Sequence, residues 1–273
     1  MSSLRDAGVL VTGAGRGIGK RLAIGFALSG ARVGLLARSK AELDLAQLEI
    51  EHAGGVALRI RADVNDPEQL LAAVDRMKVQ FGGVKALVCA AAVQGYIGPF
   101  AGSPTKAWTE IIQTNLVGVM NSCRAVLPHM IEKRSGKIIA LSGPGATGSR
   151  PNFGVYAACK AALARFVETL AEEVRDDNIQ VNCMHPGPAY TSMTDEILNA
   201  GDRAGEREIE AATQVRRTGG IPAEQQIQLA LFLASDQSNH ISGKLISVND
   251  NWRKLRDQNL EADFFTLRRM QKA

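Results

Sequence analysis

The chain has 273 residues, a length that suits one α/β domain. Apolar residues make up 45% of it, enough for a sizeable core, which excludes extensive disorder away from the ends. The formal net charge is +4, but basic and acidic residues are interleaved without a basic patch, so nucleic-acid binding is not expected.

Short apolar runs alternate with longer segments of helical periodicity along the chain. Strands are predicted over residues 9–12, 31–37, 56–61, 84–91, 137–142, 179–185 and 244–248. Helices are predicted over residues 18–29, 40–53, 67–80, 105–131, 154–175 and 224–234. This alternation predicts a parallel sheet that is covered by helices on both faces.

The first predicted strand leads directly into a glycine-rich turn. The turn reads Thr12-Gly13-Ala14-Gly15-Arg16-Gly17-Ile18-Gly19, which is typical of a strand, a phosphate-binding turn and the start of a helix. Gly13 allows the tight turn, Gly17 lets a phosphate approach the backbone, and Gly19 permits close helix packing. The N-terminus of the helix attracts the anion, so the segment predicts a dinucleotide site.

The second predicted strand ends at Ala37-Arg38-Ser39, at a position where an acidic residue would bind the ribose hydroxyls of NAD. Arg38 can instead form charge-assisted hydrogen bonds with a 2′-phosphate, and Arg16 could reach the same group. NADP is therefore favoured as the cofactor, and NAD is possible.

Tyr156 and Lys160 are four residues apart in a predicted helix, which places both side chains on one face. A free phenol has a pKa of about 10, and a neighbouring ammonium favours the phenolate and lowers that value. Two ordinary helix residues with an extended lysine would show the same spacing. The spacing alone is therefore not specific. Combined with the glycine-rich turn earlier in the chain, it indicates a dinucleotide-dependent oxidoreductase.

The order and separation of these motifs resemble the short-chain dehydrogenase/reductase family, whose fingerprint is Thr-Gly-x-x-x-Gly-x-Gly followed by Tyr-x-x-x-Lys. Further matching segments are Asp63-Val64, Asn115 to Gly118, Pro186-Gly187-Pro188-Ala189-Tyr190-Thr191, Phe232 to Asp236, and Ile241-Ser242-Gly243. The resemblance spans roughly residues 8 to 249. It implies a Rossmann-type, doubly wound, parallel seven-stranded sheet with helices on both faces, in a single domain.

The resemblance also implies roles for particular side chains. Tyr156 would act as general acid in carbonyl reduction and as general base in alcohol oxidation. Lys160 would assist it and hold the nicotinamide ribose, and Asn115 would hold a water that links Lys160 to solvent. The residues expected to contact the cofactor are Gly13, Gly15, Arg16, Gly17, Ile18, Gly19, Arg38, Ser39, Asp63, Val64, Ala90, Ala91, Asn115, Tyr156, Lys160, Pro186, Gly187 and Thr191.

Two positions depart from the family pattern. Gly143 stands where the family carries a serine, thirteen residues before Tyr156, and Ser142 lies one residue earlier. Ser142 could polarise the substrate carbonyl, or a backbone N–H of Gly143 or Gly145 could do so, or catalysis could be weak or absent. The family's Asn-Asn-Ala-Gly is replaced by Cys89-Ala90-Ala91-Ala92, which we interpret as a structural change.

Two segments lie outside the regular alternation. Residues 190–220 are rich in charge, Gly and Ala, and they are predicted to form a mobile lid at the ligand-binding edge of the sheet. An ordinary pair of surface helices is the alternative. Residues 250–273 extend beyond the catalytic domain at 1–249, and the pair Phe264-Phe265 is expected to pack on this domain or on a partner subunit.

The remaining features bear on location and partners. Four widely spaced cysteines without a Cys-x-x-Cys motif favour reduced thiols and a cytoplasmic location. The histidines are isolated, so no metal site is expected. Neither a signal peptide nor a membrane-spanning segment is expected from the sequence. The family resemblance implies a homodimer or a homotetramer.

These features predict an NADP-dependent oxidoreductase that interconverts a small-molecule carbonyl and an alcohol by hydride transfer. A catalytically weak or inactive cofactor-binding protein that acts as a sensor or scaffold is the alternative, and Gly143 motivates it. The presence of Tyr156, Lys160 and Asn115 argues against that alternative. The identity of the substrate depends on loops and stays open.

Overall fold

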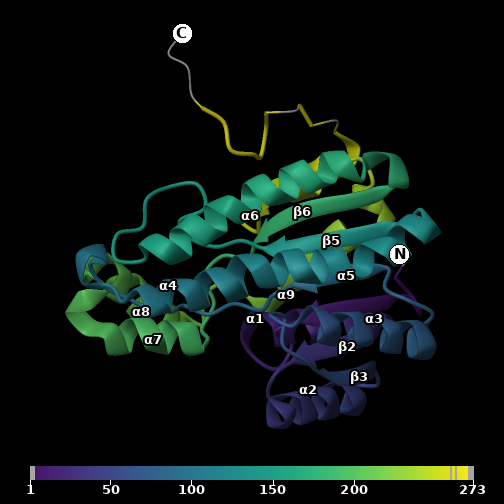
Figure 1. Ribbon diagram of the computed structural model, residues 1–273, viewed down its shortest axis with the longest axis horizontal. Coiled ribbons are helices and arrows are strands. Elements are labelled where there is room, and N and C mark those ends of the chain that lie inside the picture. The colour runs from purple at the N-terminus through teal and green to yellow at the C-terminus, as the bar shows by residue number, and fades with distance from the viewer. Residues whose placement is uncertain (1–3, 259, 262, 270–273) are drawn as a thin grey trace.

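The computed structural model describes residues 4–258, 260–261 and 263–269. Within these residues, seven parallel strands form one sheet in the order β3-β2-β1-β4-β5-β6-β7 (Figure 1). The strands are β1 (Gly8–Thr12), β2 (Arg32–Ala37), β3 (Val56–Arg61), β4 (Ala86–Cys89), β5 (Gly136–Leu141), β6 (Ile179–His185) and β7 (Leu245–Ser247). The strand order reverses between β1 and β4, which confirms the doubly wound Rossmann-type fold and the single domain.

Helices cover both faces of the sheet. α1 (Gly17–Leu28), α2 (Lys40–His52) and α9 (Ala223–Ala234) enclose one hydrophobic cluster, and α3 (Pro67–Phe81), α5 (Gly118–Lys133) and α6 (Gly154–Glu173) enclose another. Figure 1 shows α3, α5 and α6 on the same side of the sheet. None of the helices formed by the described residues has the length and hydrophobicity that crossing a membrane requires.

The sequence explains these elements locally. In β1, Val9 and Val11 point into the first cluster and Leu10 points into the second, as expected for a strand covered on both faces. At the start of α3, the Asp66 side chain accepts hydrogen bonds from two backbone N–H groups and Pro67 occupies the first turn. The helix ends at Phe81, and Gly82 after it has a φ of 77°, a left-handed conformation that favours glycine.

Two predicted elements differ in detail from the observed ones, and a third segment contains the pair of helices that was predicted as the alternative to a lid. The predicted helix 105–131 is divided into α4 (Thr105–Ile112), a π-helical turn (Gln113–Val117) and α5. The predicted strand 84–91 ends at Cys89, because the backbone N–H groups of Ala90 and Ala91 donate to Thr12 Oγ1 at 3.2 and 3.3 Å instead of continuing the sheet. The segment 190–220 contains α7 (Ser192–Ala200), a 3-10 turn (Gly201–Arg203) and α8 (Glu206–Thr218).

The C-terminal extension follows the outer edge of the sheet. Trp252 is 2% exposed and stacks on Phe232 of α9, with ring centroids 5.3 Å apart. The carbonyl of Phe265 accepts a hydrogen bond of 2.7 Å from the backbone N–H of Leu245 in β7. The Phe264 side chain is 56% exposed, so the extension buries only part of its aromatic surface. The predicted extension also includes residues 259, 262 and 270–273, which lie outside the described residues.

Candidate active site

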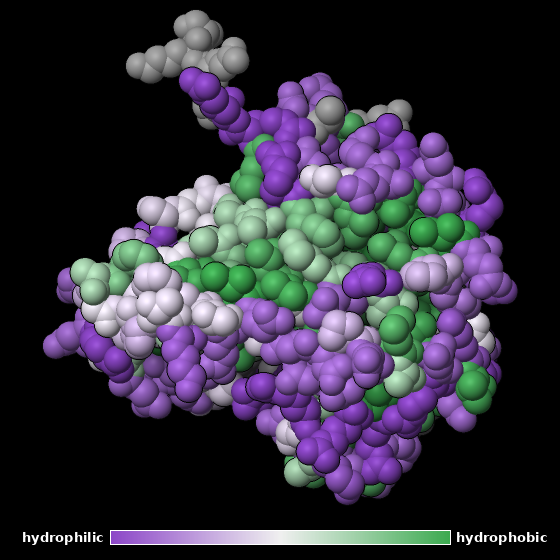
Figure 2. Space-filling view, viewed as in Figure 1, coloured by the Kyte–Doolittle hydropathy of each residue, from purple (hydrophilic) through white to green (hydrophobic). Residues whose placement is uncertain are grey.

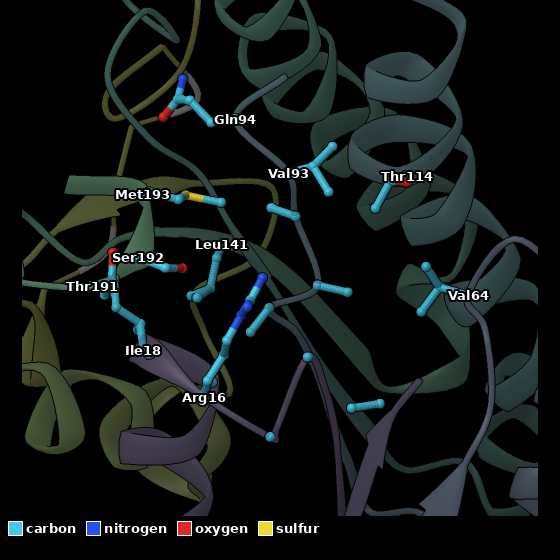
Figure 3. A pocket seen from close by; sticks show the side chains of 18 of the residues that line it. Arg16, Ile18, Val64, Val93, Gln94, Thr114, Leu141, Thr191, Ser192 and Met193 are labelled. Atoms are coloured by element: carbon cyan, nitrogen blue, oxygen red, sulfur yellow. The ribbon is translucent and has the colours of Figure 1, made fainter. Parts of the chain in front are cut away.

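A cavity of about 660 Å³ lies at the carboxyl ends of the strands, where open α/β sheets bind ligands. All the predicted cofactor-binding and catalytic residues line it except Asn115 and Gly187 (Figure 3). Lining residues that the sequence analysis missed include Glu42, Gln94, Glu110, Thr114, Met193 and Glu196. Glu42 follows the Ser39 helix cap by three residues, a capping pattern that could have drawn attention to it.

The glycine turn forms a cradle that larger residues would fill. A Cβ at Gly13 would lie 2.7 Å from the backbone of Ala91, and one at Gly19 would lie 2.3 Å from the carbonyl oxygen of Gly13. Gly17 has a φ of 57°, and a Cβ there would lie 3.3 Å from the Thr191 side chain. The starts of α1 and α7 therefore lie close together in the wall of the cavity, and both favour an anion.

Two arginines stand at one end of the cavity. Arg16 and Arg38 have largely exposed side chains, and each lies near a carboxylate. Arg16 Nη1 is 3.5 Å from Glu42 Oε1, and Arg38 Nη1 is 3.9 Å from Asp63 Oδ2. These N–O distances are long and the side chains are exposed, so neither ion pair fixes its guanidinium group. Both guanidinium groups are therefore available to a bound anion.

The tyrosine and lysine lie close together on α6, as their spacing predicts. Tyr156 is 7% exposed and Lys160 is 4% exposed. Lys160 Nζ donates a 2.8 Å hydrogen bond to the carbonyl oxygen of Leu141, at the end of β5, and lies 5.5 Å from the centre of the Tyr156 ring. The ammonium is thus fixed beside the phenol by the adjoining strand.

Gly143 lies directly opposite the tyrosine hydroxyl. A Cβ at this position would be 2.9 Å from Tyr156 Oη and 3.5 Å from Lys160 Cε. The space that a side chain at residue 143 would need is therefore occupied by the Tyr156 hydroxyl. Ser142 also lines the cavity, and its buried Oγ makes no hydrogen bond to the part of the chain that the structure describes.

Asn115 acts on the loop after β4. It lies in the π-helical turn, and its side chain accepts a hydrogen bond from the Val93 N–H and donates one to the Val93 carbonyl, both at 2.8 Å. Such turns are common at functional sites. Ala90 and Ala91 pack closely against the glycine cradle, which requires small residues in this loop.

The segment 190–220 covers one end of the cavity. Ile197, Ala200 and Ala204 pack in a third hydrophobic cluster that includes Tyr156. The two ends of the segment meet at an antiparallel bridge between Ala189 and Gly220. A 2.7 Å ion pair joins buried Arg150 Nη2, from the loop before α6, to Glu208 Oε2 of α8.

Burial and hydrogen bonding shift the pKa values of several groups near the cavity. It raises the pKa of the Glu196 carboxyl, and Arg16 acts in the opposite direction. Burial also raises the pKa of the Cys183 thiol to about 12, while a hydrogen bond with Cys123, followed by burial, raises the pKa of Cys89. These thiols stay protonated near neutral pH and act as packing groups. Across the described residues, no cluster of three or more His, Cys, Asp or Glu side chains could hold a metal ion.

A glycine cradle after the first strand and a Tyr-Lys pair in the same cavity are features of dinucleotide-dependent oxidoreductases. Comparison with known proteins gives the particular family: the chain belongs to the short chain dehydrogenase family, whose model matches residues 7–201. It is therefore an oxidoreductase that acts on CH–OH or carbonyl groups with NAD(P). This confirms the family and enzyme class that the sequence predicts.

Three similar proteins illustrate the relationship. The chain is 34% identical over 240 residues to 3-oxoacyl-(acyl-carrier-protein) reductase FabG of Escherichia coli K12, covering 88% of this chain and 94% of that protein. It is 32% identical over 250 residues to 3beta-hydroxysteroid dehydrogenase 1 of Eggerthella lenta, covering 90% and 93%. A gluconate 5-dehydrogenase of Burkholderia cenocepacia J2315, solved in complex with NADP and tartrate, superposes with a TM-score of 0.79 at 27% identity, covering 89% and 94%.

Proposed function

We propose that the protein is an NADP-dependent oxidoreductase that interconverts a small-molecule carbonyl and an alcohol through Tyr156 and Lys160. The observation that carries this proposal is the fixed Tyr156-Lys160 pair in the wall of the cavity that the glycine cradle opens into. The cradle fits a dinucleotide, because Gly13 and Gly19 allow close backbone contacts in the turn that a Cβ would block, and Gly17 has the left-handed φ of 57° that the turn before α1 uses. The two helix starts suit its diphosphate.

The proposed mechanism assigns the proton to Tyr156. When bound, the cofactor supplies or accepts the hydride. In reduction, Tyr156 Oη donates its proton to the substrate oxygen, and in oxidation it takes the proton back. Lys160, held by the Leu141 carbonyl, lies beside the phenol and is positioned to hold the nicotinamide ribose.

Ser142 is the group that we assign to polarise the substrate carbonyl. It lines the cavity, its Oγ has no partner among the described residues, and a hydroxyl can stabilise the charge that develops on the substrate oxygen. The backbone N–H groups of Gly143 and Gly145 are the alternative donors. Asn115 would contribute by holding the loop at Val93 in place and, as the family resemblance implies, by binding a water near Lys160.

The preference for NADP rests on the two arginines. Arg16 and Arg38 are available to a 2′-phosphate, and no acidic residue stands at the end of β2. The Burkholderia gluconate 5-dehydrogenase, which was solved with NADP, supports this choice. Glu42 opposes it, because its carboxylate lies beside Arg16 at the same end of the cavity.

The segment 190–220 is proposed to act as a lid. Met193 and Glu196 of α7 line the cavity, and the segment packs on the cluster that contains Tyr156. Closing this end of the cavity would exclude water from the proton transfer. The Arg150–Glu208 ion pair would hold the lid in the closed position.

The protein is further proposed to form a homodimer or homotetramer. Figure 2 shows a hydrophobic band across the face formed by α4, α5 and α6. Ile112 is exposed on this face, and Leu116, Leu127 and Phe166 are only partly buried. An apolar band of this kind favours association with a second copy through the same helices.

We also propose a cytoplasmic location for the protein. The four cysteines are buried and free, which supports a reducing compartment.

A turnover and binding experiment tests the proposed function. The purified chain is titrated with NADPH and NADH by fluorescence, and both cofactors are screened with ketones, keto sugars and acyl-type carbonyls. Tyr156→Phe should lose about 10² to 10⁴ in rate with little change in cofactor affinity, because only the proton donor is removed. Cofactor binding without turnover of any compound would instead favour the sensor or scaffold. Full turnover by Tyr156→Phe would refute the proton assignment.

A further inference from the structure

Gln94 is a buried polar residue of the candidate active site whose side-chain Nε2 has no hydrogen-bond partner among the described residues. It is 3% exposed and lines the same cavity as Tyr156 and Ser142. Its side-chain Nε2 is enclosed and makes no hydrogen bond to the described residues. Buried amides are nearly always hydrogen-bonded, so an unpartnered one beside a ligand cavity indicates a bond that a ligand completes.

The position of Gln94 is fixed by its neighbours. The preceding residue, Val93, is held by two hydrogen bonds to the Asn115 side chain. On the other side, Gly95 has a φ of 70° and packs against Ile111, where a Cβ would lie 2.2 Å from Ile111 Cγ1. The backbone around Gln94 is therefore held on both sides, and rotation of its terminal amide can present either the N–H group or the oxygen to the cavity.

The surrounding charges limit what Gln94 can bind. Figure 3 shows Gln94 and Arg16 at opposite ends of the labelled side chains, with Met193 between them. The other lining arginine, Arg38, follows β2, and Lys160 is bonded to the Leu141 carbonyl. Glu110, which is adjacent to Ile111, lines the cavity on the Gln94 side. Arg150 lies near Tyr156, with its guanidinium carbon 5.4 Å from the centre of the ring, but it is already paired with Glu208. A carboxylate ligand would be repelled by Glu110, whereas an uncharged oxygen would not be repelled.

We propose that Gln94 determines specificity by hydrogen-bonding a second, uncharged oxygen of the substrate, a hydroxyl or a carbonyl near the reacting carbon. This inference rests on the proposed function, because it places the reacting carbon at Tyr156. The substrate class is then a hydroxy ketone, a dicarbonyl compound or the corresponding alcohol. A free keto acid that presents its carboxylate to Gln94 is disfavoured.

The test compares probes that differ by one oxygen. Cyclohexane-1,2-dione is paired with cyclohexanone, and hydroxyacetone is paired with acetone, for the unmodified protein and for Gln94→Met. Methionine keeps the length of glutamine and removes the amide. Gln228→Met, on α9 outside the cavity, is the matched control for the loss of an amide. Turnover is measured with NADPH, and equilibrium binding of each probe is measured by quenching of the fluorescence of the NADPH complex.

We expect Gln94→Met to lose the preference for the probe with the second oxygen, and not to lose turnover of both probes equally. The unmodified protein should favour the oxygen-rich member of each pair, and Gln94→Met should lower that preference about tenfold to a hundredfold in kcat/KM, while NADPH affinity and the Gln228→Met kinetics stay unchanged. Equal effects of Gln94→Met on both members, or no initial preference, would overturn the inference and leave the proposed function intact. A binding preference that depends on Gln94 without turnover of any probe would support the inference and refute the proposed function.

Discussion

Placing a methyl group at residue 143 tests how closely the Tyr156 hydroxyl is confined. The Cβ of Gly143→Ala would lie 2.9 Å from Tyr156 Oη, whereas ordinary van der Waals contacts begin at 3.4 Å. The hydroxyl must therefore move by about 0.5 Å, since the φ of Gly143 is not in the left-handed region and the backbone itself accepts a side chain. A misplacement of about 1 Å can cost about 100-fold in rate, so we expect Gly143→Ala to lower kcat about tenfold.

The assay measures kcat, KM and cofactor affinity for three glycine variants. Gly148→Ala is the matched control, because a Cβ at Gly148 meets no atom within 4 Å. Gly143→Ser adds a hydroxyl to the same Cβ, so a Gly143→Ser rate above that of Gly143→Ala measures the benefit of a serine at the family position. Unchanged kinetics for Gly143→Ala would refute the reasoning, because the Tyr156 hydroxyl would then have room to move without loss of function.

Three further predictions concern other parts of the chain. Glu42→Gln should tighten NADPH binding up to about fivefold and leave NADH binding unchanged, because it removes a carboxylate beside Arg16; equal effects on both cofactors in a fluorescence titration would contradict this. Burial lowers the pKa of Lys137 to about 7 from its ordinary value of 10.5, so the unfolded chain binds the additional proton between these values. The free energy of unfolding of the unmodified protein, relative to that of Lys137→Met, should therefore rise from about pH 7 to about pH 10.5 and stay level below pH 7. If denaturant unfolding gives the same difference between the two proteins at pH 7 and at pH 10, the prediction is wrong. Deleting residues 254–273 should lower Tm by several degrees with little change in cofactor affinity, because the backbone N–H of Leu245 loses its bond to the extension; an unchanged Tm and solution size would show that the extension is passive.

The sequence predicts the sheet and the glycine cradle well because both depend on local patterns. Buried parallel strands are continuous apolar runs, and the turn after β1 needs glycines at fixed positions. Gln94 was missed because its burial depends on the bonds between Asn115 and Val93, which are 22 residues apart in the chain. The sequence shows that the serine at residue 143 is missing, but only the packing of α6 shows that the tyrosine hydroxyl takes up the space.

The π-helical turn was missed for a different reason. It widens a helix without interrupting the apolar pattern of residues 105–131, so periodicity predicts one continuous helix there. The two helices of the segment 190–220 were predicted only as the alternative to a mobile lid, because the segment is highly charged and α8 has Ala212 as its one fully buried position among the described residues. The contacts of α7 with the cluster around Tyr156 show that this segment lies at the cavity, and the sequence does not show these contacts.

The meeting of both ends of the segment 190–220 has a consequence for engineering. Beside the Ala189–Gly220 bridge, the N–H of Tyr190 donates to the Gly219 carbonyl at 3.1 Å, and the N–H of Ile221 donates to the Pro188 carbonyl at 2.7 Å. The chain thus leaves the Rossmann domain and returns to it at a single point, and the segment between contributes no strand to the sheet. A segment from a relative with the same paired ends and a threonine at the position of Thr191 can be transplanted here, and the hybrid should acquire new substrate preferences while the start of α7 stays in place beside the glycine turn.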